Sequence, residues 1–130
     1  MLLLIGAVTG LLSVIVGTVA EHVLHPHLNV TTWGQIQTAI QYQQLSAIIM
    51  VILGLALINP QRLTHATCII MQLSGWLFFV GSVLFSLMIE LTVAFSSLHL
   101  FFLAPSGGLA FCLGWIGLIV SGALQLLNQK

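Results

Sequence analysis

Charged side chains are almost absent from this sequence, which has two basic and two acidic residues among 130. A soluble domain carries roughly a quarter of charged residues, which keep its surface hydrated. A charged fraction of 3% therefore excludes a water-soluble globular domain, and the lack of a basic patch excludes nucleic acid as a partner. Cysteine is also scarce. Cys68 and Cys112 lie in separate apolar runs, which favours buried thiols over a disulfide or a metal pair.

Apolar residues fill the space that charge leaves. The hydrophobic fraction is 59% and the mean hydropathy is +1.18, so the solvent of this chain is lipid. A helix crosses a bilayer with about 20 mostly apolar residues, and four runs are long enough: residues 2–21, 39–59, 66–90 and 105–127. The sequence predicts an all-α integral membrane four-helix bundle, formed by one domain over residues 1–130. Pro60 is expected to stop the second span and Pro105 to open the fourth.

The few basic residues predict an orientation. With four spans both termini lie on one side, and Arg62, in the second connection, and Lys130 lie on that side too. Positive charge stays cytoplasmic, which predicts that the amino and carboxyl termini both face the cytoplasm.

Small residues recur along the expected helices with a period of 3.5, the repeat of left-handed helix packing. They are Gly6, Gly10, Ser13 and Gly17 in the first span, and Gly107, Ala110, Gly114, Gly117 and Ser121 in the fourth. Helices in lipid associate where small residues let backbones approach, so we expect a tight bundle rather than a glycine-lined conduit. Trp76 and Trp115 each follow a glycine in mid-span, and we interpret them as structural wedges.

Polar residues gather at the face that this orientation places outside. Glu21 and His22 end the first span, and Glu90 ends the third. With Tyr42 they form a hypothetical polar cluster, in which carboxylates would favour the protonated form of His22. An ionisable residue in a span is a functional candidate by default.

A metal site is the alternative interpretation of the same face. Its ligands would be His22, His25, His27 and His99, since imidazole suits several transition metals. The spacing matches no recognised ligand signature. Pro26 is expected to break the helix that would align His25 with Glu21, leaving His25 and His27 as solvated loop residues. We therefore expect neither a metal nor another cofactor.

Four segments carry a resemblance to a known family: "GTVAEHVL", "TAIQYQ", "GWLFFVGSVLFS" and "APSGGLAFCLGW". Their order along the chain resembles the small four-helix membrane proteins grouped as domain of unknown function 423, which occur in bacteria and are similar to a mitochondrial protein of animals. The resemblance implies a four-span fold, a bacterial cytoplasmic membrane location and no established activity. The positions that match family motifs are Gly17, His22, Tyr42, Gln43, Gly75, Trp76, Phe85, Ser86, Pro105, Gly107, Gly108, Gly114 and Trp115. Glu21, Ser46 and Glu90 depart from the family pattern, which has a small residue, His and Tyr there.

Two classes of function stay open. No nucleophile–base pair, phosphate loop or zinc signature is present, which argues against an enzyme. A structural, assembly or interaction subunit fits best, with the lipid bilayer around it and a second copy or a larger membrane complex as partner. The alternative is a small transporter or channel linked to protons or divalent metal, although Glu21 ends its span instead of lying at the midplane where transporters bind substrate.

Overall fold

The protein is a bundle of four long helical rods. The computed structural model describes residues 1–61, 63–95 and 101–128. Within these ranges four rods are long and apolar enough to cross a membrane: Leu2–His27, Val30–Ile58, His65–Ala94 and Ala104–Leu127. No strand occurs among the described residues. The predicted all-α fold with four spans is confirmed.

The first and the third of the four rods change their helical pitch along their length. The first consists of α1 (Leu2–Val19), the π-helical turn η1 (Ala20–Leu24) and the 3₁₀ turn η2 (His25–His27). The second is α2 (Val30–Ile58). The third consists of α3 (His65–Gly81), the π-helical segment η3 (Ser82–Leu87) and α4 (Met88–Ala94). The short 3₁₀ turn η4 (Phe101–Leu103) leads into α5 (Ala104–Leu127).

The helix boundaries follow local capping as well as hydropathy. The helix that contains the second span begins at Val30, because the Asn29 side chain accepts a hydrogen bond of 2.8 Å from the backbone N–H of Thr32. Asn29 has the extended backbone of an N-cap residue, with φ −75° and ψ 161°. α5 has its proline in the first turn, where no backbone N–H is needed.

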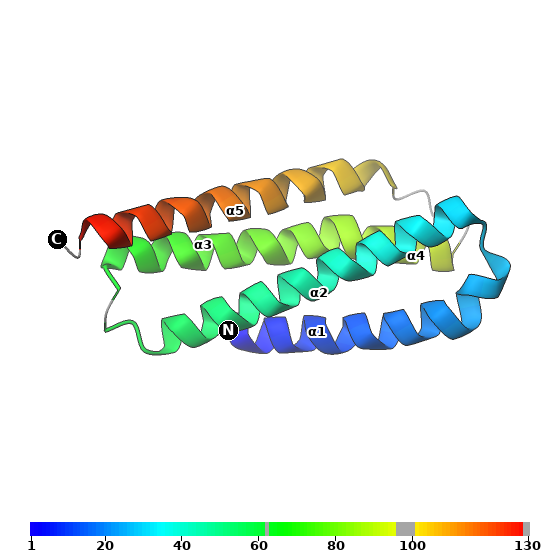
Figure 1. The fold of residues 1–130 in the computed structure, drawn as a ribbon, viewed down its shortest axis with the longest axis horizontal. Coiled ribbons are helices and arrows are strands. Elements are labelled where there is room, and N and C mark those ends of the chain that lie inside the picture. Colours follow the sequence, from blue (N-terminus) through cyan, green and yellow to red (C-terminus); the bar gives the residue numbers. More distant parts are fainter. Residues whose placement is uncertain (62, 96–100, 129–130) are drawn as a thin grey trace.

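The rods associate as two tight pairs, α1 with α2 and α3 with α5 (Figure 1). Glycines make the close approach possible. A Cβ atom on Gly6 would lie 2.8 Å from the backbone nitrogen of Val51, and one on Gly107 would lie 2.5 Å from that of Phe85. Both distances are too short for a side chain, so the small-residue seams are the contact surfaces that the sequence predicted.

The two pairs meet around a core of large apolar side chains. Its fully or almost fully buried members are Leu2, Ile49, Met50, Leu53, Phe78 and Phe111. The outside of the bundle is apolar as well: Leu4 is 68% exposed and Ile119 is 70% exposed. A surface of this kind suits lipid, which solvates leucine and isoleucine as well as a protein core does.

Figure 1 places the amino terminus toward the end of the bundle where α2 ends, α3 begins and α5 ends. Glu21 and Glu90 lie toward the opposite end. Arg62 and Lys130, on which the predicted orientation rests, are outside the described residues. That both termini face the cytoplasm stays a prediction.

Candidate functional site

Glu21 lies in the π-helical turn η1 and remains accessible. Ala20 beside it is completely buried, whereas the Glu21 side chain is 57% exposed. Its Oε1 lies 3.6 Å from Nδ1 of His25, one turn further along. The expectation that Pro26 would separate these two residues is wrong. The rod continues to His27 because Pro26 falls in the first turn of η2, where proline is tolerated.

His25 is held in place from a second side. Its ring stacks on the indole of Trp33, with centroids 4.1 Å apart and planes inclined by 20°. This contact ties η2 to the first turns of α2. His25 and His27 are both exposed, as expected, but they lie in a helical turn instead of a loop, and His25 makes ordered contacts.

His22 does not take the position that we expected for it. Its Nδ1 lies 3.0 Å from the carbonyl oxygen of Thr18. A carbonyl only accepts hydrogen bonds, so in this contact Nδ1 is the donor. Within the described part of the chain, the histidine paired with a carboxylate is His25, not His22.

The proposed metal ligands were His22, His25, His27 and His99. His99 lies outside the described residues. In the ranges that the structure covers, no three side chains of His, Cys, Asp or Glu come close enough to hold a metal ion. His25 instead contacts Glu21 and Trp33.

Tyr42 belongs to an aromatic cluster rather than to the acids. Its ring lies 5.2 Å from that of Phe85 and 5.4 Å from that of Phe111, measured between centroids. The side chain is 42% exposed. Among the residues described, no hydrogen bond or ion pair joins any two of Glu21, His22, Tyr42 and Glu90. The hypothetical cluster is thus divided.

Glu90 is the member that lies inside the bundle, at 5% exposure. Gln43 of α2 and Ser86 of η3 are similarly buried, at 4% and 0%. Both carboxyl oxygens of Glu90, Oε1 of Gln43 and Oγ of Ser86 make no hydrogen bond to any residue that the structure describes. Sequence reasoning placed Glu90 at the outer face and gave no role to the other two beyond their motif positions.

The π-helical segment η3 explains why Ser86 and Glu90 point inward. The buried positions Phe78, Ser82, Ser86 and Glu90 follow one another at intervals of four. In a regular α-helix of 3.6 residues per turn, repeated steps of four drift away from the core face. The wider π turn removes that drift, and π segments are frequent at functional sites.

Most of the motif glycines serve internal packing. Gly17 lies against Ile40, Gly75 against Leu2 and Gly114 against Phe78. Gly107 meets the backbone of η3. Gly108 is the exception, because no described atom lies within 4 Å of the position of its Cβ.

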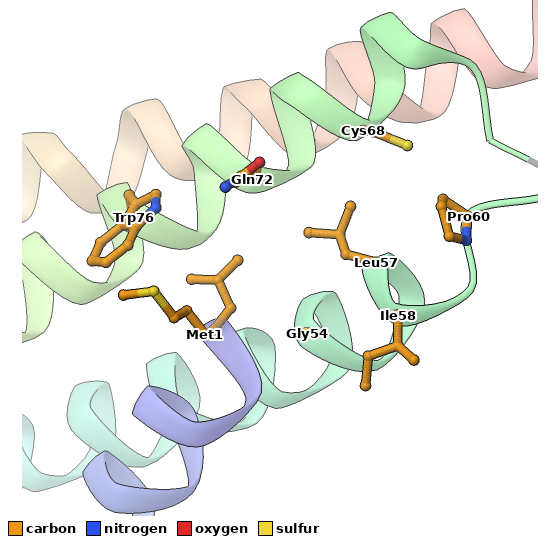
Figure 2. Close-up of a pocket in the computed structure, with 9 residues that line it drawn as sticks. Met1, Gly54, Leu57, Ile58, Pro60, Cys68, Gln72 and Trp76 are labelled. Atoms are coloured by element: carbon orange, nitrogen blue, oxygen red, sulfur yellow. The ribbon is translucent and has the colours of Figure 1, made fainter.

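The two mid-span tryptophans have different surroundings. Trp115 packs edge-on against Phe78, with centroids 5.4 Å apart, but is 45% exposed. Trp76 lines a cavity of about 360 Å³ between α3 and the facing ends of α1 and α2 (Figure 2). In that view Gln72 and Cys68 lie on the same side as Trp76, opposite Met1 and Leu57. Cys68 is only half-buried and Cys112 is exposed, so the expectation of two buried thiols is wrong.

The fold defines the class of protein: an α-helical membrane protein with four spans. The chain belongs to the family described as "Protein of unknown function (DUF423)", whose sequence profile matches residues 16–108. It is 33% identical to the UPF0382 inner membrane protein YgdD of Escherichia coli K12 over 129 residues, which are 98% of this chain and 92% of that protein. It is 29% identical to the UPF0382 membrane protein SH2409 of Staphylococcus haemolyticus over 119 residues, 92% of each chain. No solved structure matches the chain.

These likenesses confirm the resemblance found in the sequence and the expected localisation in a membrane of inner-membrane type. They also fit a membrane protein of unestablished activity. The relatives are named only as membrane proteins, so nothing about them points to an enzyme.

Proposed function

We propose that the protein is an interaction subunit of the membrane that pairs with a second copy of itself through the outward side of α5. The observation that carries this proposal is the environment of two glycines. No described atom lies within 4 Å of a Cβ placed on Gly108 or Gly122. A side chain at either position would therefore meet no described part of the chain, in contrast to one at Gly107.

The surface in question, here called the outer α5 face, consists of Gly108, Cys112, Trp115, Ile119 and Gly122. Their intervals of four, three, four and three residues place them on one side of the helix. Apart from Gly108, which is half-buried, all are exposed. In lipid the hydrophobic effect does not drive two helices together, so helices associate where glycine allows their backbones to touch. The outer α5 face has glycine near both ends of its length.

Trp115 adds a second reason for a partner on this face. Tryptophan is usual at the membrane interface, whereas Trp115 lies in the middle of α5 and presents almost half of its surface outward. A partner helix would cover the indole.

We infer a second copy as the partner because symmetry makes the surface complementary to itself. A two-fold axis along the membrane normal sets Gly108 against Gly108 and Gly122 against Gly122, so that small residues face small residues. Two-fold dimers are by far the commonest symmetric oligomers.

The native Cys112 lies on the proposed contact and permits a direct test. Oxidative crosslinking in intact membranes should convert the chain of 14.0 kDa into a covalent dimer. The dimer should be lost in Cys112→Ser and retained in Cys68→Ser, because Cys68 faces the cavity beside α2. Gly108→Leu should weaken the dimer while leaving the thermal unfolding of the monomer unchanged.

Two results would contradict the proposal. A single-chain mass in nanodiscs together with no crosslink through Cys112 would exclude the dimer. A crosslink through Cys112 to a heavier, different protein would replace the second copy by another membrane protein.

The other class of function, a proton-linked protein, is favoured by one specific observation, the buried carboxyl of Glu90.

A further inference from the structure

Four oxygen atoms lie unpaired in the interior between α2 and the third rod. They are Oε1 of Gln43, Oγ of Ser86 and both carboxyl oxygens of Glu90, and none makes a hydrogen bond to a residue within the described ranges. The three side chains are at least nine-tenths buried, at 4%, 0% and 5% exposure. Buried polar groups are normally hydrogen-bonded, so four such atoms in one region need an explanation.

Contacts between the neighbouring residues place these side chains at a similar depth. The rings of Tyr42 and Phe85 lie 5.2 Å apart, and Gln43 and Ser86 are the next residue of each segment. Ser86 and Glu90 are four residues apart on the inward side of the third rod. Further along, Val93 packs against the cluster of Ala20, Ile36 and Ile40, and α4 contacts α2, so Glu90 lies between two points at which the third rod meets its neighbours.

Among the described residues, no positively charged side chain forms an ion pair with Glu90. The chain has two basic side chains, Arg62 and Lys130. Both lie outside the described residues. An unpaired carboxylate in a low-dielectric interior is costly, whereas the neutral acid is far less so.

Most of the other described titratable groups toward this end of the bundle make contacts of their own; His27 is exposed, and His99 lies outside the described residues. Tyr42 on α2 lies among aromatic rings. On the first rod Glu21 pairs with His25, and His22 contacts the carbonyl of Thr18. None of these contacts involves Glu90, whose carboxyl group is buried without a partner among the described residues.

We propose that Gln43, Ser86 and Glu90 form an intramembrane proton-binding site. The proton resides on the carboxyl group of Glu90, which then has an O–H to donate to Oε1 of Gln43 or to Oγ of Ser86. Binding a proton thus removes the charge and supplies an O–H donor in a region where four buried oxygen atoms have no partner among the described residues. The ligand is a proton, and the wide turn of η3 is what aims the acid inward. The site does not depend on the outer α5 face, which lies on a different rod.

Infrared spectroscopy of the protein in nanodiscs tests this assignment, because the carbonyl stretch of a protonated acid is separate from that of a carboxylate. Glu21 is the only other acidic side chain in the chain. At about pH 7 we expect a protonated-acid band in the wild type and in Glu21→Gln, and its loss in Glu90→Gln. Gln43→Leu or Ser86→Ala should move the band toward the position of an acid without a hydrogen bond.

Thermal unfolding gives an independent measurement. Raising the pH from about 6 to about 9 should lower the unfolding temperature of the wild type and of Glu21→Gln, since losing the proton leaves a buried charge. Glu90→Gln, which keeps the shape without a titrating group, should lose this dependence. If Glu90→Gln does not fold, the band and the pH dependence of the wild type and Glu21→Gln still decide the proposal.

Three outcomes would overturn it. An ionised Glu90 in the wild type at about pH 7 would show that the site holds no proton. A band that neither Gln43→Leu nor Ser86→Ala moves would mean that the three residues are not one site. Loss of the band when choline chloride is replaced by sodium chloride at constant pH would make the ligand a monovalent metal cation.

Discussion

Each of the two acidic side chains of this protein lies in or just after a π-helical turn, yet one is exposed and the other is buried. Glu21 lies within the π-helical turn η1, and Glu90 lies three residues beyond the π-helical segment η3. The Glu21 side chain is 57% exposed and pairs with His25, whereas Glu90 is 5% exposed and unpaired within the described chain. A π turn therefore does not determine burial. It sets only the direction in which the following residues point.

What differs between the two regions is the neighbouring rod. η1 lies near the end of the first rod, where Ala20 packs against α2 and Glu21 borders an open pocket shared with Trp33 and Gln37 of α2. η3 is enclosed by α2 on one side and by α5 on the other. The close approach of Gly107 to Phe85 brings α5 onto η3, and the inward residues Ser86 and Glu90 are almost fully buried.

Charge reversal at the two acids should give the largest contrast. Glu90→Lys introduces an amine that is normally protonated, and no described residue offers it a counter-ion. We expect this variant to lose about 3–5 kcal/mol of stability. Glu21→Lys, at an accessible position, should change stability by less than about 0.5 kcal/mol. Thermal unfolding in mild detergent measures both. Equal unfolding temperatures for the two variants would show that the environments do not differ as described.

Adding side chains at two adjacent glycines should give the next largest effect. Leucine at Gly107 would collide with the backbone of Phe85 and push α5 away from η3, at a cost of about 1–3 kcal/mol. Leucine at Gly108 points into open space in a single chain and should leave stability almost unchanged. The measurement is the unfolding temperature of each variant in monomeric form. A destabilised Gly108→Leu monomer would place an internal contact at that position.

Truncating the histidines near Glu21 should have the smallest effect. His25→Ala removes an accessible ion pair and a ring stack on Trp33, and we expect a loss below about 1 kcal/mol. His27→Ala is the control, because its side chain is exposed. Chemical denaturation at low and high salt resolves such differences. A loss as large as that of Glu90→Lys would mean that the exposed region also determines the fold.

Several features of the fold were predictable because one physical cause determines each of them. Apolar runs of spanning length predict four rods, since backbone groups in lipid must be satisfied within a helix. The repeat that contains Gly6 and Gly17 predicts a contact stripe on the first span, and the repeat that contains Gly107 and Gly114 predicts one on the fourth; which helix meets each stripe was not predicted. Backbone contact in lipid requires small residues at such intervals.

The site was less predictable, because a regular α-helical repeat was assumed for the first and third rods, and both rods change their pitch. Glu90 was placed in the same polar cluster as Glu21, and His25 was separated from Glu21 at Pro26. In the structure η3 turns Glu90 inward, and η2 carries His25 back to Glu21. Neither π turn has a sequence signature comparable to a proline or a capping residue, so a uniform repeat of 3.6 residues was the default.

The sequence by itself determined that this protein is a membrane protein, that it has four rods and which stripes of small residues pack. These properties follow from composition and residue spacing, because the bilayer requires long apolar helices and helix contact in lipid requires small residues. Only the tertiary structure decided which of the two acids is enclosed and which glycines are left free on the outside. Burial of one side chain depends on the rod that happens to lie against it, and that neighbour comes from a distant part of the chain.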